Sequence, residues 1–243
     1  MTRRRWIADE VSGNRAALVG DHADHLVRVL RARVGQEFDI STGAGVRCGR
    51  VASVAENRVE FELGEEIPAS SVVNLKLLLS IFKFDRFEWA IEKCTELGVS
   101  SIVPVIAQRT DAHLAAASAK RVERWRRVAL QATEQSRRSG PPEIADSLKF
   151  TDAIKFPGAV LERQSPLRIV LSESEQQSAL RDVVGQSEGS VTLAIGPEGG
   201  WTDAELKLFQ QEEWISASLG PTILRAETAA IAATAICISE FGS

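Results

Sequence analysis

Three short segments of the chain carry the glycines and side chains that can take part in chemistry. In the first, residues 195–200, an apolar run ends in Gly-Pro-Glu-Gly-Gly, and Thr202 with Glu205 predicts a capping box at the start of the next helix. Glycines allow the backbone to turn sharply and to approach a bound molecule without a Cβ clash. The segment has neither the Gly-x-Gly-x-x-Gly of a dinucleotide site nor the Gly-Lys-Ser/Thr of a phosphate-binding loop. It therefore predicts a ligand loop that does not cradle phosphate, with a simple strand-to-helix turn as the alternative.

The second segment, residues 219–229, turns at a Gly-Pro pair and reaches Arg225 and Glu227 just before an alanine-rich stretch. A cation and a carboxylate at such a corner can act on a substrate, whereas Glu227 can also simply offset the positive end of a helix. Both interpretations stay open at this point. The small residues of the stretch permit close packing against another element, including a second subunit.

The third segment, residues 133–142, closes a block that is rich in arginine. Residues 109–138 contain 8 Lys and Arg against 3 Asp and Glu, and Arg137 and Arg138 lie beside a Gly-Pro turn. A planar guanidinium matches the geometry of a phosphate. The block predicts a corner that contacts phosphates, although a solvated helix face explains the arginines between 121 and 127 equally well.

The total charge conceals this arrangement. The chain has 29 Lys and Arg against 33 Asp and Glu, which gives a net charge of −4 and a pI near 5.6. Such totals are not typical of proteins that bind polyanions. However, 22 of the 29 cations are arginine, and residues 139–243 hold 15 of the acids against only 7 cations. Nucleic-acid binding is therefore compatible with the charge if one face is basic.

Composition places the chain among ordinary globular proteins, with 44% hydrophobic and 26% charged residues. The longest apolar stretch, residues 226–239, is shorter than the roughly 20 residues that cross a bilayer. Cys48, Cys94 and Cys237 lie far apart, so they predict neither a disulfide framework nor a metal site, and we expect reduced thiols that mainly serve core packing. The chain is thus expected in the cytoplasm, with no membrane and no metal.

The elements that must position the three segments fall into two regions. Up to residue 67, short apolar runs separated by turn residues predict a small β-domain, with strands over 5–8, 16–19, 37–40, 46–54 and 58–63. One helix is expected over 22–31, with Asp21 as its N-cap and Val29 facing inward. It places Arg28, Arg31 and Arg33 near its end.

From residue 74 onward strands and helices alternate, which predicts an α/β domain. Strands are expected over 75–82, 102–106, 167–171 and 191–195, and helices over 85–97 and 120–136. Asp85 with Glu88 predicts a capping box at the start of the first helix, and Gly98 predicts its end. Ligands bind at the carboxyl ends of strands in such sheets, which is where residues 195–200 lie.

Several of these segments together resemble a known family. They are Arg28-Val29-Leu30-Arg31, residues 83–99, Glu134-Gln135-Ser136, residues 195–200 and residues 219–229. Because they span almost the whole chain in the right order, the combination is far more specific than any one motif. The chain resembles the RsmE-type ribosomal RNA uridine N3-methyltransferases of the SPOUT superfamily.

The resemblance implies an α/β fold in two domains. Residues 1–70 would form a PUA-like, RNA-binding β-barrel, and residues 74–243 a SPOUT methyltransferase domain with a C-terminal trefoil knot. The implied activity is S-adenosylmethionine-dependent methylation of N3 of a uridine in 16S ribosomal RNA, on the small ribosomal subunit, by a homodimer. The knot comes from the resemblance alone, because the default expectation is an unknotted chain.

The resemblance also assigns site residues. Arg225 is expected to stabilise charge on the uracil oxygens, and Glu227 or Glu198 to remove the N3 proton. Cofactor binding is expected from Leu171, Ser172, Ile195, Gly196, Pro197, Glu198, Gly199, Gly200, Leu219, Gly220, Pro221, Ile223 and Leu224. RNA binding is expected from Arg28, Arg31, Arg33, Arg86, Arg109, Arg137 and Arg138.

The chain departs from the family's usual pattern at three positions. Thr222 stands where an arginine is usual, Ala226 where a threonine is usual, and Arg137 where a glycine is usual. Two other functions therefore stay open. One is an RNA-binding ribosome-assembly factor with a decayed methyltransferase site. The other is a nucleotide-dependent enzyme acting on a small molecule, which the missing phosphate loop disfavours.

Overall fold

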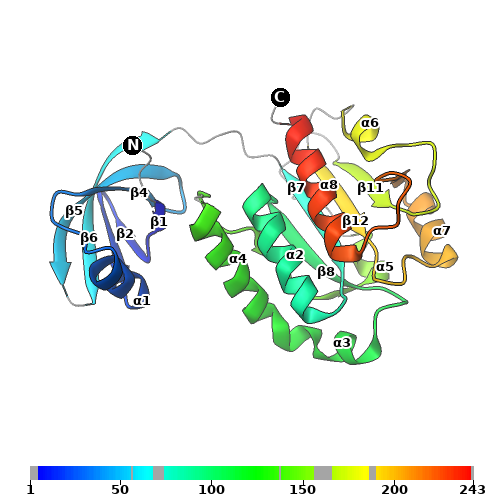
Figure 1. Ribbon diagram of the computed structural model, residues 1–243, viewed down its shortest axis with the longest axis horizontal. Coiled ribbons are helices and arrows are strands. Elements are labelled where there is room, and N and C mark those ends of the chain that lie inside the picture. Colours follow the sequence, from blue (N-terminus) through cyan, green and yellow to red (C-terminus); the bar gives the residue numbers. More distant parts are fainter. Residues whose placement is uncertain are drawn as a thin grey trace. The chain divides into compact units, whose positions relative to one another are not determined.

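The computed structural model describes residues 5–55, 57–67, 74–136, 138–155, 166–185 and 190–241 (Figure 1). The chain forms two compact units. The N-terminal unit consists of residues 1–71 and 133–141, and the C-terminal unit of residues 72–132 and 142–243. The expected RNA contact Arg137 lies outside the described residues.

The N-terminal unit is built on a six-stranded mixed sheet in the order β1-β4-β5-β6-β3-β2. Side chains along β6 alternate, so Val59, Phe61 and Leu63 are buried while Glu62 is exposed. β1 pairs with β4 in parallel, and the other ladders are antiparallel. The strands are β1 (Arg5–Ile7), β2 (Glu10–Ser12), β3 (Arg15–Val19), β4 (Glu37–Ser41), β5 (Val46–Ala55) and β6 (Arg58–Ile67).

The strand order of this unit does not by itself confirm the expected closed barrel, which stays a prediction. Each of β1 and β2 pairs with one described strand only, so they lie at the two ends of the hydrogen-bonded order. The expected strands all occur, and β2 is an addition that the sequence did not predict. The sheet still encloses a core, in which Phe38 and Phe61 meet edge to face with ring centroids 6.1 Å apart.

The expected helix over residues 22–31 is shorter and partly of a different type. It consists of α1 (Asp21–Asp24) followed by a π-helical turn, His25–Val29. The predicted cap is wrong, because Gly20 is the N-cap and Asp21 is the first helical residue. The wider turn, closed by the Leu30 N–H donating to the His25 carbonyl, rotates Val29 outward, and Val29 is 64% exposed. Leu26 is fully buried, as expected.

The C-terminal unit is an α/β domain, as predicted. Its seven-stranded sheet has the order β10-β8-β7-β12-β11-β13, with β9 also paired to β8, and every ladder is parallel. The strands are β7 (Leu75–Ser80), β8 (Ser101–Ile106), β9 (Glu143–Ile144), β10 (Leu148–Lys149), β11 (Leu167–Leu171), β12 (Val191–Ile195) and β13 (Ile215–Ala217). The short strands β9, β10 and β13 were not predicted.

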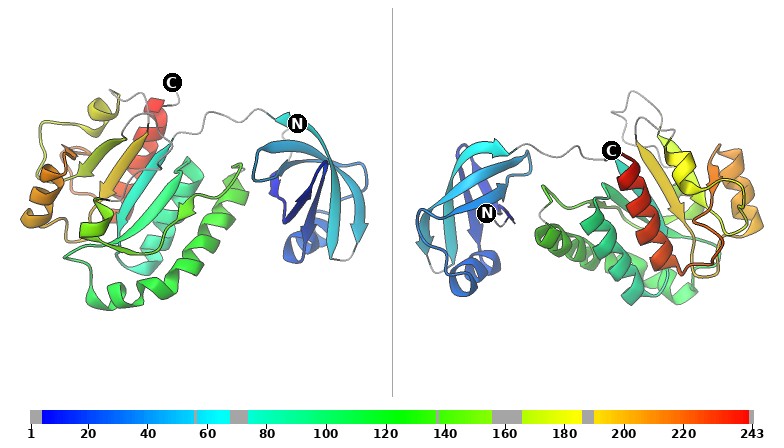
Figure 2. Two further views of the ribbon diagram at one scale, coloured as in Figure 1. Left: turned by 180° about the vertical axis from the view of Figure 1, so that it is seen from behind. Right: turned by 45° about the horizontal axis from the view of Figure 1, so that its top comes forward.

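Helices cover both faces of this sheet (Figures 1 and 2). Leu77 of β7 faces a core shared with α2, α4, α6 and α8, whereas Leu78 faces a second core with α5 and α7. Burial on both faces explains why the predicted strand is apolar without alternation. The helices are α2 (Phe84–Leu97), α3 (Ala112–Ala117), α4 (Val122–Ser136), α5 (Phe150–Ala153), α6 (Leu180–Val184), α7 (Asp203–Gln211) and α8 (Ala226–Phe241).

Helix α2 ends as predicted but begins differently. Gly98 adopts φ = +118°, and its N–H donates to the carbonyl of Cys94, which terminates the helix. The predicted capping box is wrong, because the N-cap is Lys83 and no side chain caps the helix. The Glu88 carboxylate instead accepts a hydrogen bond from Arg124 Nε of α4 at 2.7 Å. The Glu88 side chain, which the local pattern assigned to a cap, thus forms a tertiary ion pair instead.

The two cysteines of the C-terminal unit are core residues. Cys94 and Cys237 are both fully buried, and burial raises the pKa of each thiol to about 12. Both are therefore neutral thiols at physiological pH, not nucleophiles. Within the described part of the chain, no group of three or more His, Cys, Asp or Glu side chains is arranged to hold a metal ion. No helix in that part is long and apolar enough to cross a membrane.

Candidate functional site

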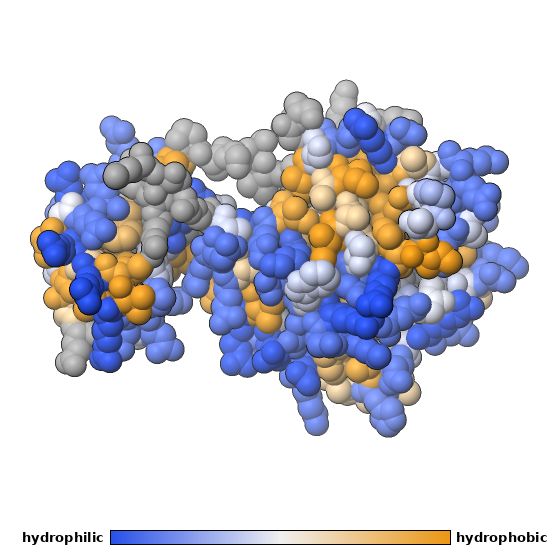
Figure 3. Space-filling view, viewed as in Figure 1, coloured by the Kyte–Doolittle hydropathy of each residue, from blue (hydrophilic) through white to orange (hydrophobic). Residues whose placement is uncertain are grey.

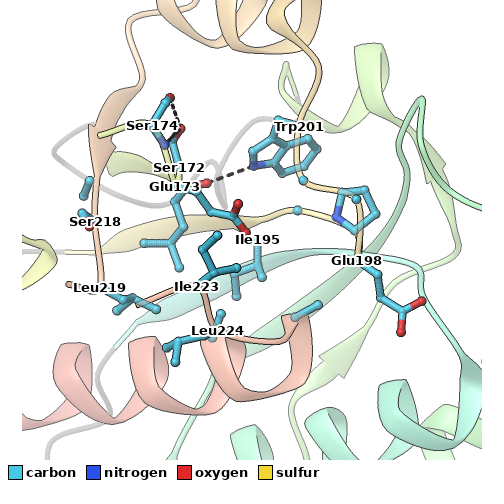
Figure 4. Close-up of a pocket in the computed structure, with 18 of the residues that line it drawn as sticks. Ser172, Glu173, Ser174, Ile195, Glu198, Trp201, Ser218, Leu219, Ile223 and Leu224 are labelled. Atoms are coloured by element: carbon cyan, nitrogen blue, oxygen red, sulfur yellow. Dashed lines mark hydrogen bonds between the residues drawn. The ribbon is translucent and has the colours of Figure 1, made fainter. Parts of the chain in front are cut away.

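A pocket of about 280 Å³ lies in the C-terminal unit, where β11, β12 and β13 reach their carboxyl ends (Figure 4). Three loops form most of its wall, after β11, after β12 and between β13 and α8. Every residue expected to bind a cofactor lines it. These residues are Leu171, Ser172, Ile195, Gly196, Pro197, Glu198, Gly199, Gly200, Leu219, Gly220, Pro221, Ile223 and Leu224.

The loop after β12 is held by its glycines and by a tryptophan. Gly200 has φ = +67°, and its N–H donates to the Pro197 carbonyl at 2.8 Å, which closes a tight turn. A Cβ on Gly196 would lie 3.3 Å from the indole nitrogen of Trp201. That nitrogen donates to the Leu171 carbonyl at 3.1 Å. The indole therefore joins the ends of β11 and β12, and glycine leaves room for it.

Helix α7 anchors the other end of this loop. As predicted, Thr202 and Glu205 form a capping box: the Glu205 N–H donates to Thr202 Oγ1, and the Thr202 N–H donates to Glu205 Oε2. The second carboxylate oxygen of Glu205 accepts from the N–H of Gln108, in the loop after β8. Glu205 is only 3% exposed, so one buried carboxylate fixes two loops near the pocket.

The loop before α8 gives the pocket an apolar side. Gly220 has φ = +121°, and its N–H donates to Ser218 Oγ at 3.1 Å. Leu219 and Leu224 line the wall, and Ile223 is 78% exposed at the same place. An isoleucine left in solvent beside a pocket provides apolar surface that a ligand can cover.

The ionisable residues of the lining are mostly acidic: Arg109, Glu173, Glu198 and Asp203. The Arg109 guanidinium donates to the carbonyls of Gly199 and Trp201, so it braces the loop. Its charge does not offset those of the three acids. Such a pocket suits a cationic or neutral ligand and repels phosphate.

Glu198 and Glu227 share one arginine. Nη1 of Arg86, on α2, lies 3.2 Å from Glu198 Oε1 and 3.7 Å from Glu227 Oε1. Glu227 is 4% exposed, does not line the pocket, and its Oε2 is buried without a hydrogen bond to any described residue. Glu198 is exposed on the pocket rim, and Figure 4 shows its side chain directed away from the other labelled residues. The two candidate bases therefore have different surroundings.

Arg225 stands directly before α8. Its carbonyl accepts from the Ala229 N–H, and its side chain is exposed. Arg225 does not line the pocket, whereas its neighbours Leu224 and Ala226 do. Arg225 is therefore adjacent in the chain to two lining residues without forming part of the wall.

The arginines expected to bind RNA separate into groups. Arg28, Arg31 and Arg33 are exposed in the N-terminal unit, and Arg28 also forms an ion pair with Asp24. Arg138 is half-buried, and burial lowers the pKa of its guanidinium. As described above, Arg86 and Arg109 instead make contacts at the pocket.

Several lining residues were not predicted from the sequence. Glu173 and Ser174 follow β11, Ser218 follows the unpredicted strand β13, and Trp201 follows the glycine loop. The end of the expected strand 167–171 was a usable signal for Glu173, since ligands bind beyond the carboxyl ends of strands. Ser218 had no such signal, because β13 is only three residues long.

Comparison with known proteins agrees with this architecture. The profile of the RNA methyltransferase domain family matches residues 69–238. The ribosomal RNA small subunit methyltransferase E of Rickettsia conorii is 32% identical over 224 residues, which cover 90% of this chain and 87% of that protein. The protein of the same name from Bacillus subtilis is 29% identical, and the match covers 88% of this chain and 85% of that protein.

Solved structures extend the likeness to three dimensions. The small subunit methyltransferase E of Neisseria gonorrhoeae, bound to S-adenosylmethionine, superposes with a TM-score of 0.81 at 28% identity, covering 96% of each chain. A Legionella pneumophila methyltransferase with the same bound cofactor also gives 0.81, at 26% identity and 98% coverage of each chain. This chain belongs to the RNA methyltransferase family, and within it to the ribosomal RNA small subunit methyltransferases E.

Proposed function

We propose that this protein transfers the methyl group of S-adenosylmethionine to N3 of a uridine in 16S ribosomal RNA of the small ribosomal subunit. The observation that carries the proposal is the pocket. It gathers all the residues expected to bind the cofactor in a domain whose relatives are ribosomal RNA methyltransferases. The same family membership supports a SPOUT fold with a trefoil knot for the C-terminal unit.

The pocket fits the chemistry of this cofactor. S-adenosylmethionine carries no phosphate and has a positively charged sulfur, and when bound it supplies an electrophilic methyl group. Ile195, Leu219 and Leu224 provide apolar surface for an adenine ring, and the glycine loop exposes backbone groups to its polar edge. The excess of acidic residues in the lining favours a cation and disfavours a nucleotide phosphate.

Two side chains take the chemical roles. Methylation replaces the N3–H bond of uridine by an N3–C bond, so the proton must pass to a base. Glu198 accepts it, because this carboxylate is exposed on the rim, whereas Glu227 is buried and lies outside the lining. Arg225, which is exposed and lies in the chain between the lining residues Leu224 and Ala226, stabilises the charge that develops on the uracil oxygens.

Residues 1–70, which make up most of the N-terminal unit, are the proposed RNA-binding, PUA-like domain. Its exposed Arg28, Arg31 and Arg33 contact phosphates of the RNA. A substrate inside the small ribosomal subunit also means that the protein works in the cytoplasm.

The enzyme acts as a homodimer through α8. Figure 3 shows hydrophobic residues gathered over this helix. Ala232, Ala235 and Ile236 of α8 are only half-buried within the single chain, and alanines let a second helix approach closely. A second copy of the chain is therefore the expected occupant of this face. Sedimentation should show a dimer that Ala232→Glu converts to a monomer, and a monomeric wild-type protein would contradict this.

The decisive experiment is transfer of labelled methyl groups to small ribosomal subunits, followed by nucleoside analysis. N3-methyluridine is the expected product, and its absence would refute the proposal.

Glu198→Gln should lower kcat by about 100-fold or more, and Arg225→Ala should abolish turnover while calorimetry still shows cofactor binding. Glu213→Gln, at an exposed glutamate outside the lining, is the matched control. A decayed methyltransferase would show no cofactor binding at all.

A further inference from the structure

We propose that the Glu173 carboxylate stabilises the positively charged sulfur of S-adenosylmethionine, and that it thereby makes the protein bind the methyl donor more tightly than the spent product. The inference rests on the proposed function, since it concerns the cofactor of that reaction. Glu173 belongs to neither of the two sequence motifs at the pocket, residues 195–200 and residues 219–229.

Glu173 is an exposed residue just beyond the end of β11. It follows Leu171 by two positions and lines the cavity. Figure 4 shows its side chain among Ile195, Ile223 and Trp201, in the middle of the labelled residues. Within the part of the chain that the structure describes, no hydrogen bond or ion pair engages its carboxylate. The group is therefore available to a ligand.

The other charged groups of the lining are engaged elsewhere. Glu198 pairs with Arg86 at 3.2 Å, and Arg109 donates to two loop carbonyls. Asp203 stands in the first turn of α7, where the positive end of the helix stabilises its charge. Among the described residues, Glu173 is thus the one lining carboxylate with neither an ion pair nor a place in the first turn of a helix.

The chemistry of the cofactor supplies that partner. Its sulfonium lies between the adenosyl and amino-acid parts, at the middle of the molecule, and Figure 4 shows the Glu173 side chain between others that line the pocket. Transfer of the methyl group leaves a neutral thioether in S-adenosylhomocysteine, while the amino and carboxylate groups stay unchanged. A carboxylate about 4 Å from the sulfur therefore favours donor over product by a factor of about 5 in a solvent-exposed pocket.

The test compares affinities, not activity. Isothermal titration calorimetry gives Kd for S-adenosylmethionine and for S-adenosylhomocysteine with the wild-type protein, Glu173→Gln and Glu173→Ala. Both variants should lower the ratio of product Kd to donor Kd about fivefold. Glu213→Gln removes the same charge from an exposed position outside the lining and should leave the ratio unchanged. Raising the salt concentration should also lower the ratio of product Kd to donor Kd of the wild-type protein, because salt screens the attraction between the two charges.

The outcomes separate this inference from the proposed function. If the wild-type protein binds neither compound, the proposed function fails and this inference fails with it. If the wild-type protein binds the donor but both Glu173 variants leave the ratio unchanged, only this inference is overturned. Equal weakening of donor and product also overturns it, because the contact would then be to a group that both compounds share.

Discussion

At the scale of single residues, Arg86 has a role that its charge alone did not indicate. Its guanidinium contacts the exposed Glu198 and the buried Glu227, so it joins the loop after β12 to the start of α8. A buried carboxylate without a partner is costly, because burial removes the water that would otherwise solvate its charge. Arg86 is therefore a positioning residue at the pocket, whatever it also contributes to RNA binding.

Removing Arg86 should consequently destabilise the protein. We expect Arg86→Ala to lower the free energy of unfolding by about 1–3 kcal/mol, because Glu227 is left buried and unpaired. Urea denaturation measures this loss. The double variant Arg86→Ala/Glu227→Gln should recover part of it, since no charge then remains buried. Arg127→Ala, an exposed arginine on α4, is the control, expected within about 0.5 kcal/mol of wild type. An Arg86→Ala protein as stable as the control would refute the coupling.

At the scale of elements, the start of α7 connects local sequence to the pocket. The capping box of Thr202 and Glu205 was predictable because all its partners lie within four residues. The predicted box at Asp85 and Glu88 was wrong, because Arg124, 36 positions further along the chain, binds the Glu88 carboxylate. A local pattern therefore holds only where no distant side chain competes for the same group.

Loss of the α7 cap should lower both the stability of the protein and the cofactor affinity of the pocket. Thr202→Ala removes the oxygen that accepts the Glu205 N–H, and we expect a loss of about 1 kcal/mol in unfolding free energy. Cofactor affinity should fall with it, since Glu205 also holds Gln108 and α7 follows the glycine loop directly. Thr202→Ser retains the hydroxyl and should keep both properties, as measured by thermal unfolding and calorimetry. Equal effects of the two substitutions would show that the hydroxyl is not responsible.

At the scale of the whole molecule, the distribution of charge matters more than its sum. The net charge is −4, yet the exposed Arg28, Arg31 and Arg33 lie within six consecutive positions of the N-terminal unit, while the ionisable residues of the pocket lining are mostly acidic. Each phosphate contact releases counterions, so binding of an acidic protein to RNA can still depend strongly on salt.

Binding to small ribosomal subunits should therefore weaken as salt rises. In a plot of log affinity against log salt concentration, Arg28→Ala/Arg31→Ala/Arg33→Ala should reduce the slope by about 2, at roughly 0.7 per phosphate contact. Arg181→Ala, an exposed arginine of the C-terminal unit that pairs with Glu240, should leave the slope unchanged. Affinity that does not vary with salt would contradict this reading of the charge.

The sequence by itself determined the features that depend on near neighbours along the chain. It predicted the alternation of strands and helices after residue 74, the helix end at Gly98, the α7 cap and the two loops of the pocket. These follow from glycine conformations, capping side chains and apolar runs, whose physical causes act within a few residues. The resemblance to a known family, carried by the same segments, gave the function class.

Only the tertiary structure decided which distant groups meet. Arg86 and Glu198 are 112 positions apart, and Trp201 reaches the Leu171 carbonyl across 30. The strand order of the N-terminal sheet, the outward turn of Val29 and the place of Glu173 in the pocket lining were also settled there. The reason is physical: ion pairs, strand pairing and pocket walls depend on distance in space, and the parallel sheet brings the ends of strands from separate parts of the chain to one edge.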